Sequence, residues 1–346
     1  MRWILTIAAS AAGMGSAALS QTGESSLMKP FSQREGYAET IGLGETAPVG
    51  KRSVPDDRYA FRIQLENDVF FGHDKDYTNG VRLEFTQRLE NGDHYGISLT
   101  QLIFTPQHHA EGAVYGEHPY AGWLTAGGGY VFIEENCSTA LEFQLGWTGR
   151  ASIAEDCQWF IHELEHLEQW DGWGDQMPGE VTLQFSLRRN VRLKALEYNS
   201  AGGFQTDGLA YGRLEGGTVF VSGGAGLIYR FGRNLPPSVN DFTINGANYG
   251  VSPFRNRGYD SGSNSYYGIA GVFGKYVVRN MFLDGSAFHD FDPHISKEPW
   301  IIDVYLGVGM RVDDIDYFFG AVYRSCQYKT QSGYTLFGSL QVKWNF

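Results

Sequence analysis

The chain has 346 residues and a formal net charge of −12, and 15% of its residues are aromatic. This acidic balance excludes a protein that recruits nucleic acid through a general positive field. A composition with 45 Gly, only 11 Pro and many aromatic residues is typical of all-β membrane proteins.

The first 55 residues predict two segments ahead of the folded domain. Residues 1–20 contain an early positive charge, an apolar stretch and small residues near Ser20, which predicts a secretory signal peptide. Residues 21–55 are polar and rich in Gly, Ser, Thr and Glu, which predicts a flexible periplasmic leader. We assign residues 56–346 to one folded domain, in which no stretch of ~18 apolar residues predicts a transmembrane helix.

Short segments of alternating apolar and polar residues fill this domain. In the last of them, Leu340, Val342 and Trp344 alternate with Gln341 and Lys343. Because side chains of a strand have a period of two, such a segment has one apolar and one polar face. A final strand of this kind, ending on an aromatic residue, is typical of a bacterial outer-membrane barrel, in which lipid contacts the apolar face.

Thirteen segments are candidate strands. They lie at roughly 61–66, 81–86, 94–105, 121–133, 139–148, 180–191, 194–204, 216–231, 265–277, 280–288, 299–311, 315–325 and 335–346. A single-chain bacterial barrel has an even number of strands, so one segment is wrong or one is missing. We therefore expect an all-β fold, a transmembrane antiparallel β-barrel of about twelve strands.

One segment, residues 154–170, breaks the alternation. Its apolar residues recur at helical spacing, and Gln158 and His162 lie four residues apart on a polar face. Outer loops of barrels are long and periplasmic turns are short, so we expect a short helix in an extracellular loop. Residues 232–264 form another long loop.

Acids and amides crowd the predicted turn between the first two strands, at Glu66-Asn67-Asp68 and at 74–80. Carboxylate and amide oxygens are the ligands that Ca²⁺ prefers, although an ordinary polar loop would look the same. Alternation places Asp68 and Thr78 on the lumen side and Asn67 on the lipid side. An amide is out of place there unless another element covers it, and the predicted helix could be that cover.

The helix also contains His162-Glu163-Leu164-Glu165-His166, which matches the H-E-x-x-H motif of zinc metalloproteases. No third ligand segment follows at a convincing spacing. The alternative is a histidine that removes a proton from water while a cation holds the oxyanion. Since no G-x-S-x-G motif occurs, directly activated water is the more natural hypothesis.

Several motifs, in this order and spacing, resemble those of one family, the outer-membrane lipid A 3-O-deacylases. They are Glu66-Asn67-Asp68, residues 76–80, residues 119–123, Gln158-x-x-x-His162, residues 173–176, residues 279–285 and residues 337–340. The resemblance implies a twelve-stranded barrel that removes the 3′-linked acyl chain of lipid A with Ca²⁺. It also implies that a histidine activates the attacking water.

The resemblance assigns roles to individual residues. His162 resembles the general base, and Gln158, Asn67 and Thr78 resemble other active-site positions. Asp68, Asn67 and Glu168 resemble the residues that would hold Ca²⁺. A helix would turn Glu168 about 120° away from His162, which puts Glu168 in doubt unless the helix ends before it.

The family also implies a location and partners. The protein should lie in the bacterial outer membrane with its site facing the outer leaflet. Its partners should be lipid A or lipopolysaccharide, other outer-membrane lipids and the barrel assembly machinery. Two alternatives stay open, namely another outer-membrane lipid esterase such as a phospholipase, and a non-catalytic porin-like barrel.

Three cysteines bear on the expected topology. Cys157 opens the predicted helix and Cys326 lies in the last outer loop, whereas Cys137 lies in a predicted periplasmic turn. The two ends of a barrel are ~25 Å apart, so Cys137 should pair with neither of the others. If any disulfide forms, it should join Cys157 and Cys326.

Overall fold

A computed structural model describes residues 58–72, 75–108, 116–165, 172–244, 246–255, 259–260 and 263–346. The expected signal peptide (1–20) and leader (21–55) lie outside these residues. The strands of the described part are β1 (Tyr59–Asn67), β2 (Asp76–Arg88), β3 (His94–Thr105), β4 (Ala121–Ile133), β5 (Cys137–Thr148), β6 (Val181–Arg192), β7 (Tyr198–Asn199), β8 (Phe204–Gly217), β9 (Phe220–Arg233), β10 (Ser265–Asn280), β11 (Trp300–Val312), β12 (Ile315–Arg324) and β13 (Thr335–Asn345). The helical segments are η2 (Val69–Phe71), η3 (Gly149–Ser152), α2 (Ala154–Glu165), η4 (Gly172–Asp175), η5 (Lys194–Leu196) and α3 (Met281–Asp284). None of the helices described here is long and apolar enough to cross a membrane.

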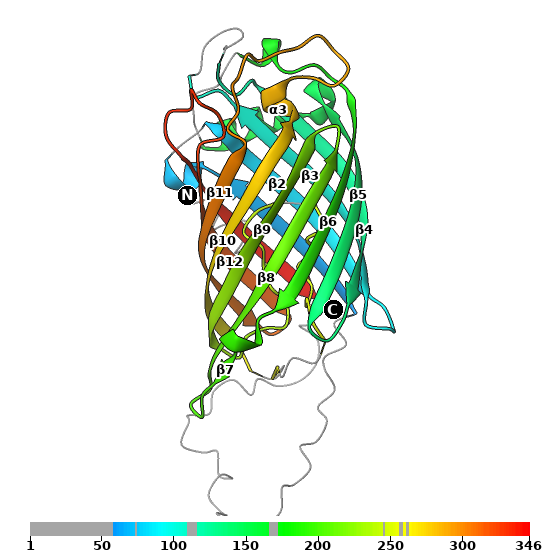
Figure 1. The fold of residues 1–346 in the computed structure, drawn as a ribbon, viewed down its shortest axis with the longest axis vertical. Coiled ribbons are helices and arrows are strands. Elements are labelled where there is room, and N and C mark those ends of the chain that lie inside the picture. The colour runs from blue at the N-terminus through cyan, green and yellow to red at the C-terminus, as the bar shows by residue number, and fades with distance from the viewer. Residues whose placement is uncertain are drawn as a thin grey trace, which may run out of the picture. The chain divides into compact units, whose positions relative to one another are not determined.

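The strands form one antiparallel sheet that closes on itself (Figure 1). β1 pairs with β13, and β6 pairs with β8 to complete the ring. The short β7 pairs with β8 alone. Each of the twelve long strands in the described part of the chain therefore has two hydrogen-bonded neighbours, and the predicted twelve-stranded barrel is confirmed.

The strand prediction differs from the structure in three places. Residues 280–288 contain α3 and a loop, and residues 194–204 contain η5 and the short β7. β8 was largely missed because its alternation is inverted. Leu209 and Tyr211 point inward and are buried, while small residues occupy most of the outward positions. Removing two segments and adding one resolves the odd count.

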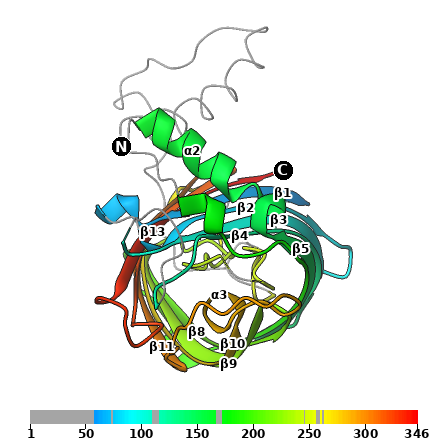
Figure 2. The same cartoon turned by 90° about the horizontal axis from the view of Figure 1, so that it is seen from above.

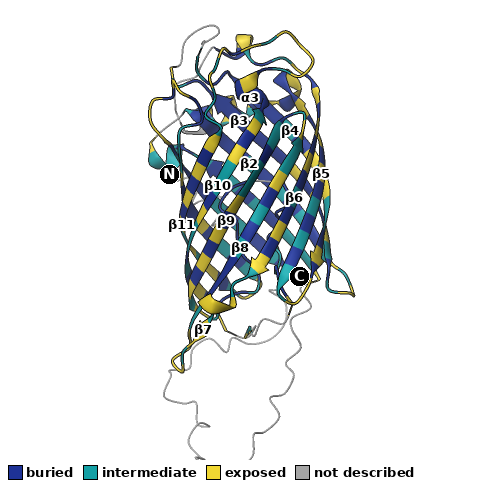
Figure 3. Ribbon diagram, viewed as in Figure 1, coloured by how far each residue is buried: buried dark blue, intermediate teal, exposed yellow. Residues whose placement is uncertain are grey.

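Burial along the strands is the reverse of that in a water-soluble protein (Figure 3). Large apolar side chains such as Phe143, Leu306 and Val308 are exposed on the outer face. Charged side chains such as Arg62 and Glu84 are buried in the lumen, 2.8 Å apart. An outer face of this kind suits hydrocarbon rather than water.

Part of the lumen is occupied by a long loop that enters from the end where β1 begins and β13 ends. This loop joins β9 to β10, and we call its residues 235–254 the plug. Its side chains Val239, Phe242, Ala247 and Tyr249 are buried. Figure 2 shows the backbone of this loop, in yellow, inside the ring of strands. If the leader is periplasmic, this connection is periplasmic too, and its length departs from the short turns expected there.

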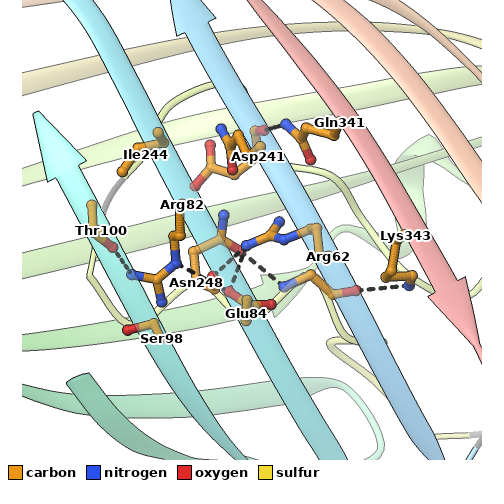
Figure 4. A network of polar contacts seen from close by, with 12 residues as sticks. Arg62, Arg82, Glu84, Ser98, Thr100, Asp241, Ile244, Asn248, Gln341 and Lys343 are labelled. Atoms are coloured by element: carbon orange, nitrogen blue, oxygen red, sulfur yellow. Dashed lines mark hydrogen bonds and ion pairs between the residues drawn. The ribbon is translucent and has the colours of Figure 1, made fainter. Parts of the chain in front are cut away.

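The plug is held by the charged side chains of the inner wall (Figure 4). Arg62 donates a hydrogen bond to the carbonyl oxygen of Asn248 at 2.8 Å, and Lys343 donates to that of Gly250 at 3.0 Å. Arg188 forms an ion pair with Asp241 of the plug. These contacts pair charges that would line a water-filled channel in a porin, so the plug belongs to the folded core.

We expect the plug to seal the barrel. Replacing residues 238–252 with a short Gly-Ser link should open a path for ions, because it removes the residues that fill the lumen. Single-channel recording in planar bilayers should show conductance for this variant and none for the unmodified protein. Deleting the exposed turn 200–203 beside β7 is the control, and it should leave the barrel closed. Porin-like conductance of the unmodified protein would contradict a sealed lumen.

Candidate active site

Polar residues lie on the outer face of the wall, where β1, β2 and β3 meet the extracellular rim. Asn67 continues the outward parity of Ile63 and Leu65 and lies opposite Asn79 of β2. Asn79 in turn lies opposite Ile103 of β3. The predicted lipid-side position of Asn67 therefore agrees with the register of the sheet.

A β-bulge changes the direction of Thr78. The pairing of β2 with β3 shifts between Tyr77 and Asn79, so Thr78 is an extra residue in its strand. The Thr78 hydroxyl lies 2.6 Å from the hydroxyl of Thr105, which has the outward parity of β3. The expectation from simple alternation that Thr78 faces the lumen is therefore wrong, because the extra residue reverses the alternation.

Asp68 leaves the strand rather than continuing it. Its backbone is in the right-handed helical region and starts η2, so strand parity does not apply to it. The Asp68 carboxylate accepts a hydrogen bond from the backbone N–H of Lys75 at 2.7 Å, and its own N–H donates to the Thr78 carbonyl at 3.3 Å. The side-chain oxygen of Asn67 accepts from the N–H of Val69 at 2.7 Å. The amide NH₂ of Asn67 takes no part in this bond and can donate a hydrogen bond to another group.

Helix α2 covers this part of the outer face. On the outward side of β3, Ile97 is 57% exposed and Leu99 is 47% exposed, whereas Ile103 on the same side is fully buried. Ile103 packs in one cluster with Ala154 of α2 and Trp173 of η4. Figure 2 shows α2 outside the ring of strands, near the ends of β2, β3 and β4. A helix outside the barrel, as expected for a cover, is therefore present, and its described contacts are with β3 and β4, whose neighbour β2 pairs with the strand of Asn67.

One face of α2 turns toward the wall. Ala154, Gln158 and His162 are buried and follow one another at four-residue steps. The Gln158 side-chain oxygen accepts a hydrogen bond from the indole N–H of Trp173 at 2.7 Å, which fixes the orientation of its amide. Its NH₂ group is buried without a hydrogen-bond partner among the described residues. A buried donor of this kind marks a place where a bound water or substrate atom would complete the site.

His162 is not the only buried histidine among the described residues. His118 is also buried, but its ring stacks on Phe104 at 4.8 Å, and Phe104 points into the lumen. Burial lowers the pKa of His118 to about 3, so this ring stays neutral. The wall therefore separates His118 from the outer face, whereas α2 carries His162 on the outer side of the barrel.

The structure thus places most of the predicted site residues on the outer side of the barrel. Asn67 and Thr78 lie on the outer rim, and Gln158 and His162 lie on the helix that packs against that wall. Glu168 lies outside the described residues. Thr105 was missed, although its polar side chain at an outward position of β3 is the same signal that identified Asn67.

The zinc-protease hypothesis finds no support in the helix geometry. Glu163 is exposed and points away from the face that carries His162, and His166 lies outside the described residues. No group of three or more His, Cys, Asp or Glu side chains within the described ranges is placed to hold a metal. A directly activated water remains the better hypothesis for His162.

The cysteines agree with the expected topology. Cys137, Cys157 and Cys326 are all free thiols in the structure. Cys137 begins β5 at the end of the barrel opposite the helix, as predicted. In this structure no disulfide joins Cys157 and Cys326.

The docking of α2 depends on a glycine. A Cβ atom on Gly122 of β4 would lie 2.1 Å from the Ser152 hydroxyl and 2.3 Å from the Ala154 Cβ. Gly122→Val should therefore displace α2 and make residues 149–180 sensitive to protease, while the barrel stays folded. Gly128→Val is the control, since Gly128 lies on the same face of β4 with nothing within 4 Å of its Cβ position. Equal protease sensitivity of the two variants would contradict this packing.

Comparison with known proteins agrees with the architecture. The chain matches the model of the family described as "Outer membrane protein LpxR" over residues 31–346. Among solved structures, LpxR from Salmonella typhimurium has a TM-score of 0.71 at 16% identity, covering 83% of this chain and 100% of that one, which shows a shared fold. The β domain of the Bordetella autotransporter BrkA (TM-score 0.41, 9% identity, 83% and 98% covered) and the KdgM porin (0.35, 8%, 83% and 99%) are more distant barrels. No match was found among curated proteins.

The match over most of the chain, the closed barrel and its apolar outer face place the protein in the bacterial outer membrane. The chain belongs to the LpxR family of outer-membrane proteins, the lipid A 3-O-deacylases that its motifs resemble.

Proposed function

We propose that this protein is a Ca²⁺-dependent lipid A 3-O-deacylase that hydrolyses the 3′-linked acyl ester of lipid A in the outer leaflet. The observation that carries the proposal is the pair of buried side chains Gln158 and His162 on α2, a helix that packs through Ala154 against Ile103 on the outer side of the barrel, next to the polar rim. A lipid ester can reach this side from the leaflet without entering the lumen. The family to which the chain belongs supports the choice of lipid A.

The residues of the site suit ester hydrolysis by water. A neutral His162 would take a proton from the attacking water as general base. Negative charge then develops on the carbonyl oxygen, and the NH₂ groups of Gln158 and Asn67 are donors that could stabilise it. The Thr78 and Thr105 hydroxyls, 2.6 Å apart, could orient the water or the ester. Each donor is fixed by a second contact, so little reorganisation would be needed during the reaction.

The donor atoms near the rim fit calcium. Asp68 supplies a buried carboxylate, and Asn67 and Thr78 supply amide and hydroxyl oxygens, with no sulfur among them. Asp68 and Asn67 would hold the ion, together with Glu168 from outside the described residues. A bound Ca²⁺ supplies positive charge that stabilises the oxyanion and attracts the phosphates of lipid A despite the protein's net charge.

The far face of α2 suits contact with lipid. Ile153, Trp159 and Phe160 are exposed by 47%, 43% and 61%, and the helix lies outside the ring of strands (Figure 2). Exposed aromatic residues of this kind are typical of the boundary between hydrocarbon and headgroups. The catalytic face would then lie at the depth of the acyl esters of the outer leaflet.

The two alternatives can be separated from this proposal. A porin is disfavoured by the plug, which fills the lumen with paired charges. Another lipid esterase would use the same chemistry on a phospholipid ester. Mass spectrometry of lipid A and of phospholipids from cells with and without the gene tests both, and loss of a 3′-linked acyl chain from lipid A alone is the expected result.

We expect His162→Ala to lower the rate of deacylation by about 10²- to 10⁴-fold, because it removes the general base. The rate should be measured by mass spectrometry of lipid A treated with purified protein. Glu163→Ala is the matched control, since Glu163 is the exposed neighbour on the same helix. Both variants should keep the heat-modifiable migration of a folded barrel. Full activity of His162→Ala would remove this residue from the mechanism.

Chelation should stop the reaction and Ca²⁺ should restore it. Calcium should also raise the melting temperature of the purified protein, because a ligand at 100 times its Kd stabilises the folded state by about 2.7 kcal/mol. Asp68→Ala should weaken both responses. Its control is Asp156→Ala, an exposed acid on α2. Undiminished activity in excess EDTA would disprove the calcium requirement.

A further inference from the structure

The outer site and the inner plug meet at the two residue pairs 66–67 and 77–78. In each pair the two neighbours point to opposite sides of the wall. Asn67 and Thr78 point outward into the candidate site. Glu66 and Tyr77 point into the lumen and are buried there, with exposures of 1% and 4%.

The two inward side chains are bonded to each other. The Tyr77 hydroxyl donates to the Glu66 carboxylate at 2.6 Å. The Tyr77 ring packs between Phe104 and Phe337, with ring centroids 5.6 Å and 5.0 Å away. Gly80 leaves room for this contact, since a Cβ on Gly80 would lie 2.1 Å from the Tyr77 hydroxyl. The bulge that turns Thr78 outward is therefore held from inside by Tyr77.

Glu66 also binds the plug. Its second carboxylate oxygen accepts from the backbone N–H of Ile244, a plug residue, and from the Gln64 side chain at 3.0 Å. One buried carboxylate thus receives three donors, from the wall, the bulge and the plug. A carboxylate satisfied in this way has a single preferred position, because moving it would leave buried donors without partners.

We propose that Glu66 and Tyr77 are positioning residues for the deacylation, which hold Asn67 and Thr78 in place through the wall and make the plug part of the support of the site. This inference rests on the proposed function for its kinetic test. A displacement of about 1 Å at a reacting group can cost a large part of a catalytic rate without weakening substrate binding.

The kinetic test compares two buried tyrosines of the lumen. Tyr77→Phe keeps the ring and removes the bond to Glu66. Tyr305→Phe is the matched control, because Tyr305 is equally buried, donates to Asp303 at 3.2 Å and stacks on Phe242 of the plug at 4.7 Å, yet lies on β11. We expect Tyr77→Phe to lower kcat about tenfold with KM unchanged, and Tyr305→Phe to leave both unchanged. Equal kcat values for the two variants would overturn the inference.

A conservative variant at the carboxylate gives a second comparison. In Glu66→Gln the amide oxygen can still accept from Ile244, and the amide NH₂ can donate to the Tyr77 oxygen. Glu66→Gln should therefore keep most of kcat, whereas Glu66→Ala should lower it at least as far as Tyr77→Phe does. An Ala variant as active as the Gln variant would show that the carboxylate does not position the site.

A measurement that does not depend on deacylase activity tests this inference separately from the proposed function. Thr78→Cys, in a chain whose three native cysteines are replaced by serine, reports the position of residue 78 through its rate of reaction with a maleimide. Adding Tyr77→Phe should change that rate at least about fivefold, and adding Tyr305→Phe should not. An unchanged rate with Tyr77→Phe overturns the inference whether or not the protein is a deacylase. A changed rate in a protein without deacylase activity supports the inference and overturns the proposed function.

Discussion

Closure of the sheet is the constraint on which the rest of the molecule depends. In a closed barrel every strand residue points either to the lipid or to the lumen, and no edge offers a third direction. An outward polar residue must then be covered, and an inward charge must be paired. Helix α2 covers the outer face at Ile103, which lies beside the polar residues of the rim. The plug provides partners for inward charges such as Arg62 and Arg188.

The buried charged side chains of the inner wall explain why a long loop can fold into the lumen. Arg82 pairs with Glu84 at 3.1 Å and with Glu142 at 3.1 Å, and Glu142 also accepts from the N–H of Ala247 in the plug. A buried ion pair contributes little net stability by itself, but removing one partner leaves an expensive unpaired charge. Such a network therefore favours one position of the plug over many. The network therefore contributes more to fixing one position of the plug than to the stability of the folded state.

The sequence alone was enough to predict the architecture, because alternation, the helical segment and the lengths of the loops are local signals. It was also enough to predict that Asn67 needed a cover. The direction of Thr78 could not be predicted, since a bulge is visible only in the pairing of β2 with β3. The plug was seen as a loop but not as a luminal element, because the contacts of residues such as Asp241 and Ile244 join parts of the chain more than 50 residues apart. β8 was overlooked because Leu209 and Tyr211 in its middle point inward while Gly208, Ala210 and Gly212 point outward, against the pattern used to find strands.

The position of the site on the outer face also has a physical consequence for its donors. Gln158 is buried between α2 and η4, and hydrogen bonds to developing charge are stronger in buried surroundings than in solvent. The same environment makes an unpaired donor costly, by about 1–3 kcal/mol for a group such as the Gln158 NH₂. A bound water or substrate oxygen would accept from this donor, whose orientation the bond to Trp173 fixes. In the proposed reaction a developing oxyanion would accept more strongly than a neutral ester oxygen, so Gln158 would stabilise the transition state more than the bound substrate, which is the condition for catalysis rather than for simple binding.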